Sequence, residues 1–381
     1  MKKFNYLVSS YLLLHIAFSQ PFSIGHKQIT FTDPARSNRS ILTEIYYPST
    51  SSGDNTPIAN GTFPVIVFGH GFVMSWDAYK CFWDTLVPMG YILVFPRTEG
   101  SISPNHNEFA LDLRFLNEKM KAENTNPSSF FYQRISNKSA IMGHSMGGGC
   151  SFLAAASYTG STTLVNFAAA NTNPSSIVAA KNVTIPLLMF IGQNDGVTPP
   201  NQHQIPMFDS CASSCKTRVT ILGGGHCYFA DYNFNCSFGE GTTSPQPNIT
   251  RAEQQRRVFH ILKPYLNYIL KNSSTDSILF INRLQNNSEF NYVRQCSTLT
   301  ILNEHNNFSR DWTVAPNPFE DKLVFNFYKN KTYNVRISSL DGHWVFQLVT
   351  TQKTLEIPTS KLKNGIYIVS VNGQSVKLLK Q

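Results

Sequence analysis

Hydrophobic and polar positions alternate in two periods over the first two thirds of the chain. Short apolar runs typical of buried strands are separated by longer segments whose apolar residues recur at helical spacing. This order predicts a mostly parallel sheet with helices on both faces, an α/β fold over residues 20–271. The expected strands span 26–31, 41–47, 64–69, 91–95, 138–142, 164–168, 186–191 and 217–222, and the expected helices span 76–87, 109–120, 146–158 and 252–270.

The pattern changes after residue 271. Residues 272–313 are rich in Asn, Ser and Thr and have weak periodicity, so we expect a linker with one short ordered piece at 278–281. Residues 314–381 form short apolar runs separated by turns, and Asp341-Gly342 and Asn372-Gly373 are hairpin signals. A small all-β sandwich is predicted for this segment.

The N-terminus has the pattern of an export signal. Lys2 and Lys3 precede a mostly apolar stretch at 6–18, and the small residues Ala17 and Ser19 allow cleavage before Gln20. We therefore expect a signal peptide at 1–19 and a secreted mature protein. A retained membrane anchor is the alternative, although the apolar stretch is short for a span of the bilayer.

The excess of positive charge lies outside the predicted α/β domain. The formal net charge is +9, of which Lys2 and Lys3 contribute +2. Residues 314–381 hold nine Lys or Arg and four Asp or Glu, which gives +5 for the tail. A nucleic-acid partner would need a concentrated basic face with interleaved aromatic residues, and the sequence has none. We therefore expect no nucleic-acid partner.

Export changes how the cysteines are interpreted, because close pairs tend to form disulfides in an oxidising compartment. Cys211 and Cys215 are four residues apart, and Cys227 and Cys236 are nine apart, so we expect two disulfides from these four residues. No His/Cys spacing is typical of a zinc site, so we expect neither a metal nor a cofactor. The other three thiols, Cys81, Cys150 and Cys296, are expected to be free. Cys81 and Cys150 fall within apolar helical patterns.

The motif Gly143-His144-Ser145-Met146-Gly147 lies between a predicted strand and a predicted helix. A tight turn of this kind needs glycine two residues on either side of the serine, and it lifts the hydroxyl above the sheet. The helix N-terminus then directs free N–H groups at negative charge that develops beside it. Ser145 is the predicted nucleophile; a purely structural glycine turn is the alternative.

A serine nucleophile needs a base and an acid that orients the base. In this fold the chain order is serine, acid, histidine, each after a strand. Asp195 follows the strand at 186–191, and His226 follows the next strand in a glycine loop. We therefore predict Asp195 and His226 as the partners of Ser145. Two other histidines are less suited as the base because of the chain order: His70 and His144, of which His144 is expected to face the cleft. Two other carboxylates are less suited as the acid, since Asp112 lies in a predicted helix and Asp231 comes after His226.

The tetrahedral intermediate of acyl transfer needs two N–H donors. One is expected from Met146, directly after the nucleophile. The second is expected from the loop after the strand at 64–69, at Phe72, with Gly71 as the close alternative. Phe72 and Met146 would then also line the substrate pocket; for Phe72, an ordinary core position is the competing interpretation.

The combination of Gly143–Gly148 with Gly71-Phe72, Asp195 and His226 resembles the bacterial cutinase-like polyester hydrolases of the α/β-hydrolase superfamily. It is most similar to their PET hydrolase-like relatives from Bacteroidota, over about residues 22–271. The resemblance implies that the amides and side chains of Phe72 and Met146 contact the substrate. One departure concerns the loop 171–175, which lacks the tryptophan that family members use as an aromatic clamp. Trp76 could take the place of the missing clamp tryptophan, but a role in core packing is favoured.

The tail resembles the type IX secretion sorting domain of Bacteroidota. The resemblance rests on Pro316-Asn317-Pro318-Phe319, Leu340-Asp341-Gly342, the stretch 362–367 and the basic end at 377–380. It implies a partner in the type IX secretion machinery. A carbohydrate-binding β-module is the alternative for this segment.

Taken together, these features predict a secreted, monomeric carboxylic ester hydrolase that acts on small or polymeric esters through an acyl-enzyme. A lipase or a peptidase on the same fold is the main alternative. A surface adhesin with a silent hydrolase fold is disfavoured by the intact set of Ser145, Asp195 and His226.

Overall fold

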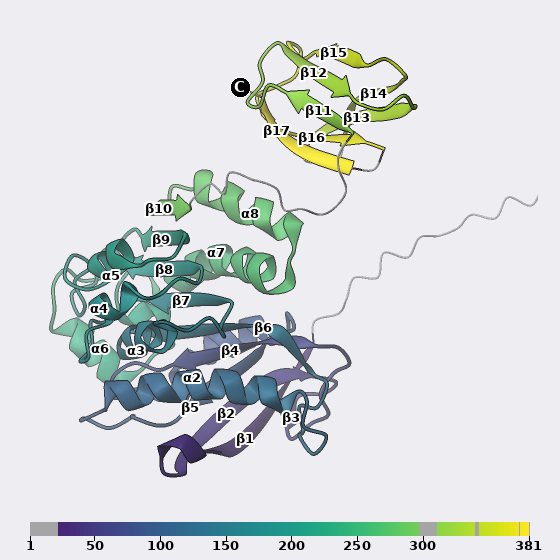
Figure 1. Cartoon of the computed structure of the whole chain (residues 1–381). Coiled ribbons are helices and arrows are strands. Elements are labelled where there is room, and N and C mark those ends of the chain that lie inside the picture. The colour runs from purple at the N-terminus through teal and green to yellow at the C-terminus, as the bar shows by residue number, and fades with distance from the viewer. Residues whose placement is uncertain (1–21, 297–310, 340–342, 373, 381) are drawn as a thin grey trace, which may run out of the picture. The chain divides into compact units, whose positions relative to one another are not determined.

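The computed structural model of the chain describes residues 22–296, 311–339, 343–372 and 374–380 (Figure 1). They form two compact units, and the boundary falls between Cys296 and Asp311. The predicted signal peptide at 1–19 lies outside the described residues, as do the hairpin signal Asp341-Gly342 and Gly373.

The first unit is built on a sheet of ten strands in the order β10-β9-β8-β7-β6-β4-β5-β2-β1-β3. The six central strands, from β9 to β5, run parallel, and β2 and β10 pair antiparallel to the two ends of this set. The strands are β1 (Ser23–Asp33), β2 (Arg39–Ser49), β3 (Gly53–Asp54), β4 (Phe63–Gly69), β5 (Ile92–Pro96), β6 (Ile135–His144), β7 (Thr163–Phe167), β8 (Leu187–Gly192), β9 (Cys215–Ile221) and β10 (Phe290–Cys296).

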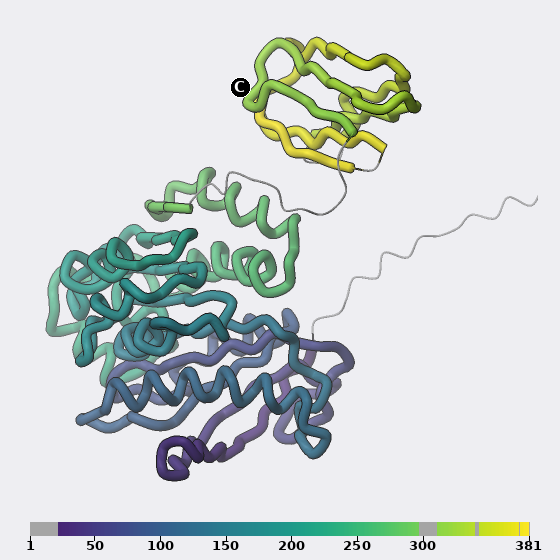
Figure 2. The backbone as a smooth tube through the Cα atoms, in the orientation of Figure 1, coloured from purple at the N-terminus to yellow at the C-terminus, as the bar shows by residue number. Residues whose placement is uncertain are grey.

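Helices cover both faces of the sheet (Figure 2), and the α/β prediction is confirmed. One face packs against α2, α3, α4 and α5, and the other packs against α1, α7 and α8. The helices of this unit are α1 (Lys80–Leu86), α2 (His106–Glu123), α3 (Met146–Ala155), α4 (Ser176–Ala180), α5 (Gln204–Ser210), α6 (Phe234–Gly241), α7 (Arg251–Lys271) and α8 (Ser274–Gln285), with 3₁₀ turns at Pro34–Arg36, Trp76–Tyr79 and Cys227–Phe229.

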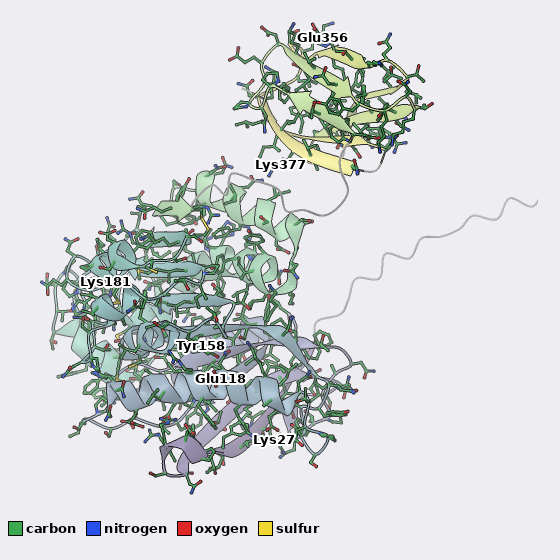
Figure 3. The ribbon with its side chains drawn as sticks, in the orientation of Figure 1. Lys27, Glu118, Tyr158, Lys181, Glu356 and Lys377 are labelled. Atoms are coloured by element: carbon green, nitrogen blue, oxygen red, sulfur yellow. A yellow bond between two sulfur atoms is a disulfide. The ribbon has the colours of Figure 1, made fainter. Side chains whose placement is uncertain are left out.

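Strand β4 shows why the sheet must be covered on both sides. Val65 and Val67 belong to the core under α2 and α3, whereas Ile66 and Phe68 belong to the core under α1 and α7. Successive side chains of a strand point to opposite faces, so a run that is apolar at every position is stable where both faces are buried. Exposed charged residues such as Glu118 and Lys181 lie on the outside of the layers (Figure 3).

The segment after residue 271 differs from the predicted linker. Ser273 caps α8 by accepting a hydrogen bond from the Asp276 amide, and Phe280 and Leu284 of α8 are buried in the core shared with α7. Strand β10 then pairs with β9 along its whole length. Helix and strand form because apolar residues in an otherwise polar stretch find a partner face, which composition alone does not reveal. Residues 272–296 therefore belong to the first unit.

One predicted disulfide is confirmed and the other is wrong. Cys227 and Cys236 are joined, as expected. Cys215 is joined to Cys296 rather than to Cys211, because β9 and β10 place residues 215 and 296 directly opposite each other. Cys211 is a buried thiol beside the Val183 carbonyl, and it is free together with Cys81 and Cys150.

The second unit is a β-sandwich, as predicted. A sheet in the order β11-β12-β15 and a sheet in the order β14-β13-β16-β17 share one apolar core that includes Phe325, Val335 and Val369. Phe319 is fully buried in it, and Glu356 and Lys377 point outward (Figure 3). Its strands are β11 (Trp312–Ala315), β12 (Lys322–Phe327), β13 (Tyr333–Ser339), β14 (Trp344–Thr350), β15 (Thr354–Pro358), β16 (Gly365–Val371) and β17 (Gln374–Lys380).

Candidate active site

Ser145 lies in a strained turn between the end of β6 and the start of α3. Its backbone has φ 55° and ψ −120°, a conformation that costs an L-residue on the order of 1–3 kcal/mol. Hydrogen bonds hold the turn: the Ser145 amide donates to the Phe167 carbonyl (3.0 Å), and the Ser145 carbonyl accepts from the Ala170 amide (2.8 Å). The strain is therefore imposed by the surrounding sheet and raises the serine above its edge.

Close approach of the backbone explains the glycines of the motif. A Cβ atom on Gly143 would lie 2.2 Å from the Gly147 carbonyl oxygen. A Cβ atom on Gly147 would lie 2.1 Å from the Gly69 carbonyl oxygen at the end of β4. Both obstacles are backbone atoms that cannot rotate away, so the turn requires glycine on both sides of Ser145.

Ser145 lines an open cleft of about 400 Å³. Phe72 contributes an aromatic side chain that is 48% exposed, and Met146 lines the cleft as the first residue of α3. Small and polar residues, Ala170, Asn171 and Thr172, also line it, where the resemblance led us to look for a tryptophan. The remaining lining comes from the loop before α2 and its first residue: Ser103, Pro104 and His106.

Asp195 and His226 follow the neighbouring parallel strands β8 and β9, and the structure brings their side chains together. The His226 Nδ1 atom lies 2.9 Å from the Asp195 Oδ2 atom, and both side chains are buried. The other carboxylate oxygen, Oδ1, accepts hydrogen bonds from the amides of Val197 (3.0 Å) and Thr198 (2.7 Å). The carboxylate is thus fixed in the orientation that can hold the imidazole in one tautomer.

Two residues missed by the sequence analysis complete this contact. The Thr198 hydroxyl donates to Asp195 Oδ2 (2.8 Å) and lies 3.0 Å from His226 Nδ1. The Gln204 side-chain amide donates to the Thr198 hydroxyl (2.9 Å) from the start of α5. Thr198 could have been suspected from its position three residues after Asp195, whereas no local pattern indicates Gln204.

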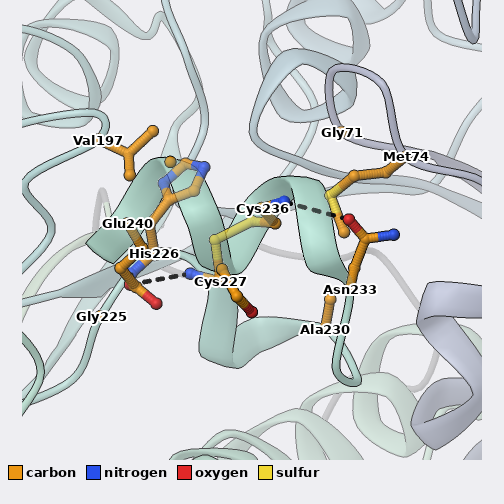
Figure 4. The surroundings of a disulfide bond; sticks show 12 residues. Gly71, Met74, Val197, Gly225, His226, Cys227, Ala230, Asn233, Cys236 and Glu240 are labelled. Carbon is orange, nitrogen blue, oxygen red and sulfur yellow. Dashed lines mark hydrogen bonds between the residues drawn. A yellow bond between two sulfur atoms is a disulfide. The ribbon is translucent and has the colours of Figure 1, made fainter. Parts of the chain in front are cut away.

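The backbone of the His226 turn is held by a buried carboxylate. Glu240 Oε1, on α6, accepts hydrogen bonds from the amides of His226 (2.5 Å) and Cys227 (3.1 Å). The disulfide between Cys227 and Cys236 ties the same turn to the same helix (Figure 4). Arg251 of α7 donates to the Cys227 carbonyl from the other side. Helix α6 therefore acts as a clamp on the turn that carries His226.

His144 was predicted to face the cleft, but it is buried and is not among the residues that line the cleft. Its Nδ1 atom lies 3.0 Å from the Tyr79 hydroxyl, and its Nε2 atom lies 3.0 Å from the His226 carbonyl oxygen. The Gly71 amide donates to the Tyr79 hydroxyl (2.7 Å), which also lies 3.5 Å from the Met74 sulfur. Because the His226 carbonyl can only accept, His144 Nε2 is the donor and Nδ1 accepts from the Tyr79 hydroxyl. By this network, the neutral imidazole carries its proton on Nε2 and donates it to the His226 carbonyl.

Burial explains the protonation states in this network. It is the main cause that lowers the pKa of His144 well below its ordinary value of 6.5, and the neighbouring His226 lowers it further. Burial also raises the pKa of the Tyr79 hydroxyl. Neutral His144 and protonated Tyr79 thus form an unbroken chain from the loop after β4 to the turn after β9, a connection that the sequence does not reveal.

The same network engages one of the two expected oxyanion donors of the loop after β4. The Gly71 amide is already bonded to Tyr79 and so is not available to a substrate. Among the described residues, the Phe72 amide makes no hydrogen bond. Met146 is the first residue of α3, where an amide has no partner within the helix. The amides of Phe72 and Met146 are therefore left without a hydrogen-bond acceptor in the described part of the protein.

The turns that carry Ser145 and His226 are connected by a hydrogen bond from a side chain to the backbone. His144, the residue before Ser145, donates to the His226 carbonyl, and the two rings lie 4.9 Å apart between centroids. In the described part of the chain, no hydrogen bond joins the Ser145 hydroxyl to the His226 ring. Such contacts are often long before substrate binds, and they tighten in the complex.

The less suited candidates have structural partners. Asp112 is buried and bonds Arg39 (2.8 Å) and the Thr98 hydroxyl (2.6 Å). Asp231 accepts the amide hydrogen of Cys81 (2.8 Å) near the start of α1. The ring of His70 is buried between the carbonyl oxygens of Gly71 and Thr98. None of the three lines the cleft that holds Ser145.

Trp76 also lies elsewhere. Its ring packs under the Arg97 guanidinium at 4.1 Å, and its indole N–H donates to the Tyr46 hydroxyl.

Within the described ranges, no group of three or more His, Cys, Asp or Glu could hold a metal ion. No helix of the same ranges is long and apolar enough to cross a membrane.

Comparison with known proteins gives two family matches. A family model described as PET hydrolase-like matches residues 20–240, more than half of the chain, and this range includes Ser145, Asp195 and His226. A model described as a secretion system C-terminal sorting domain matches residues 313–381. No curated protein matches the chain with significance. The sorting domain marks a secreted or cell-surface protein, and by its α/β unit the chain belongs to the PET hydrolase-like family of hydrolases.

Proposed function

We propose that the protein is a carboxylic ester hydrolase with Ser145 as nucleophile, His226 as general base and Asp195 as the carboxylate that orients the base. The observation that carries the proposal is the buried 2.9 Å contact of His226 Nδ1 with Asp195, held beside the strained Ser145 turn. With Nδ1–H donated to Asp195, Nε2 is left as the acceptor for the serine proton.

The reaction follows from this arrangement. The Ser145 oxygen attacks the ester carbonyl while its proton passes to His226 Nε2, and the amides of Phe72 and Met146 stabilise the oxyanion. The imidazolium then gives its proton to the leaving alcohol, and an acyl-enzyme remains. A water molecule, activated by the same imidazole, attacks the acyl carbonyl, and the collapse of that intermediate releases the acid and restores Ser145.

The open cleft favours an apolar ester as the substrate. Its walls include the exposed ring of Phe72 and small residues such as Ala170, and none of its described lining residues is an Asp, Glu, Lys or Arg. A long polymer can therefore lie across the site without desolvating a charge. Together with the match to the PET hydrolase-like family, this supports a polyester as the substrate class, with aromatic polyesters such as PET included.

The Ser145→Ala variant tests the proposal. We expect it to lose hydrolysis of p-nitrophenyl butyrate and labelling by a fluorophosphonate probe, because both need the hydroxyl. Ser103→Ala, which removes a second serine of the same cleft, is the matched control and should retain both. Retained turnover by Ser145→Ala would refute the assignment. Comparison of tributyrin, long-chain triglycerides and anilides with the short ester separates an esterase from a lipase or a peptidase.

A further inference from the structure

The turn that contains Phe72 holds a strained residue. The Met74 amide donates to the Gly71 carbonyl (3.1 Å), which closes a β-turn with Phe72 and Val73 at its two central positions. Val73 has a φ of 47°, whereas Phe72 is not among the residues with a positive φ. This combination is the signature of a type II turn, whose third position normally holds glycine or asparagine. A β-branched side chain in this conformation is an outlier, and Val73 is the only such residue that the structure describes.

The surroundings of the turn leave room for it to relax. An open pocket of about 280 Å³ lies against Val73, Met74 and Ser75, and Asn233 and Asn235 at the start of α6 line the same pocket. Close packing therefore does not enclose Val73 on this side. Strained backbone persists only where its surroundings hold it in place, so specific contacts must do what packing does not.

Hydrogen bonds supply these contacts at both ends of the turn. At its exit, the Asn235 side-chain amide donates to the Val73 carbonyl oxygen (3.0 Å). At its entry, the Gly71 amide donates to the Tyr79 hydroxyl (2.7 Å), and the Gly71 carbonyl oxygen lies 2.9 Å from His70 Nδ1. Tyr79 and His70 belong to the neighbourhood of β4, whereas Asn235 is 162 residues away from Val73 in the sequence.

Two peptide units connect Asn235 to the Phe72 amide. The C=O and N–H groups of a trans peptide are coplanar and point in opposite directions. Asn235 fixes the Val73 carbonyl and so orients the Met74 N–H of the same peptide. The Met74 N–H in turn fixes the Gly71 carbonyl, and this orients the Phe72 N–H at the other end of that peptide. A change at Asn235 is therefore transmitted to the Phe72 N–H.

We propose that Asn235 is a positioning residue for the oxyanion donor: it holds Val73 in the strained turn and thereby directs the Phe72 N–H at the carbonyl that Ser145 attacks. The proposal rests on the proposed ester hydrolysis. Without Asn235, strain drives Val73 toward a negative φ, as in a type I turn, by rotation of the peptide between Phe72 and Val73. Helix α6, which clamps the His226 turn, then orients a second part of the same site.

The kinetics of p-nitrophenyl butyrate hydrolysis test this role. Asn235→Ala should lower kcat roughly three- to tenfold, the effect of one hydrogen bond, and leave KM within about twofold, because an oxyanion donor acts mainly in the transition state. Asn235→Asp keeps the size of the side chain but cannot donate, so it should lose at least as much. Asn286→Ala removes a similar exposed bond, to the Asn282 carbonyl on α8, and is the matched control that should keep the wild-type kcat. A wild-type kcat in Asn235→Asp, or an equal loss in Asn286→Ala, overturns the proposal.

The strain itself is tested in a Val73→Gly background. Glycine adopts a positive φ without steric cost, so the turn no longer depends on the bond from Asn235. Relative to the Val73→Gly parent, the added Asn235→Ala change should lower kcat less than about 1.5-fold. A side chain that only stabilised α6 would give the same loss in both backgrounds, and that result would overturn the proposal.

A third measurement does not depend on activity. In the full-length chain with Ser145→Ala, hydrogen exchange at the Met74 amide reports how often the turn opens. Asn235→Ala should accelerate this exchange roughly three- to tenfold, and Asn286→Ala should leave it unchanged. An unchanged rate in Asn235→Ala overturns the proposal. A wild-type chain that hydrolyses no ester refutes the proposed ester hydrolysis and leaves the exchange measurement intact.

Discussion

Replacement of Tyr79 by Phe breaks the chain that connects the loop after β4 with the turn after β9. The ring keeps its contacts, since Phe has the same shape and the Tyr79 ring lies 4.7 Å from that of Phe68. The change removes the acceptor of the Gly71 amide (2.7 Å) and the donor to His144 Nδ1 (3.0 Å), both of which are buried. The hydroxyl also lies 3.5 Å from the Met74 sulfur, a weak acceptor, so the perturbation is confined to these two hydrogen bonds and one weak contact.

The magnitude follows from the two orphaned groups. A buried polar group left without its partner costs about 1–3 kcal/mol, so Tyr79→Phe should lower the free energy of unfolding by about 2–6 kcal/mol. The larger effect is expected on catalysis. The released Gly71 amide shifts the peptide that presents the Phe72 N–H, and kcat should fall roughly 10- to 100-fold, as small misplacements of catalytic groups do.

Urea unfolding and the kinetics of p-nitrophenyl butyrate hydrolysis measure the two effects. Tyr265→Phe is the matched control, because its buried hydroxyl bonds Thr163 (2.6 Å) and touches nothing near the cleft. Thr163 keeps a bond to the Pro186 carbonyl, so this variant should lose about 1 kcal/mol and keep the wild-type kcat. A Tyr79→Phe enzyme that is destabilised but has the wild-type kcat would refute the role of this network in positioning the loop.

Two further predictions concern the buried histidine and the corrected disulfide. Burial lowers the folded-state pKa of His144 well below 6.5, so below pH 6.5 the unfolded chain binds a proton that the native state does not. The free energy of unfolding therefore decreases as the pH is lowered. His144→Gln should reduce this slope by up to about 1.4 kcal/mol per pH unit in urea titrations between pH 7.5 and 5; an identical slope would contradict a neutral His144. Cys296→Ser opens a link between residues 81 apart and should cost about 4 kcal/mol of stability with little change in kcat. Unaltered stability, or a thiol label on Cys215 in the unreduced wild-type chain, would contradict the pairing.

Local pattern alone determined the architecture and indicated the residues of the proposed chemistry. The continuous apolar run of β4 requires a sheet covered on both faces, and the chain order of Ser145, Asp195 and His226, each after a strand, predicts which side chains gather at the sheet edge. These conclusions depend on periodicity and on short turns. Both are properties of a few neighbouring residues, and the sequence displays them directly.

The tertiary structure decided which distant residues meet. The partner of Cys215 is set by the register of β10, 81 residues away, and not by the nearby Cys211. In the same way, Tyr79 meets His144 and Glu240 meets the His226 amide because strands and helices from different parts of the chain converge at one sheet edge. Such contacts have no local signature, since each residue taken alone has the composition of an ordinary helix or turn. Packing, rather than pattern, therefore selected the groups that hold the proposed catalytic residues in position.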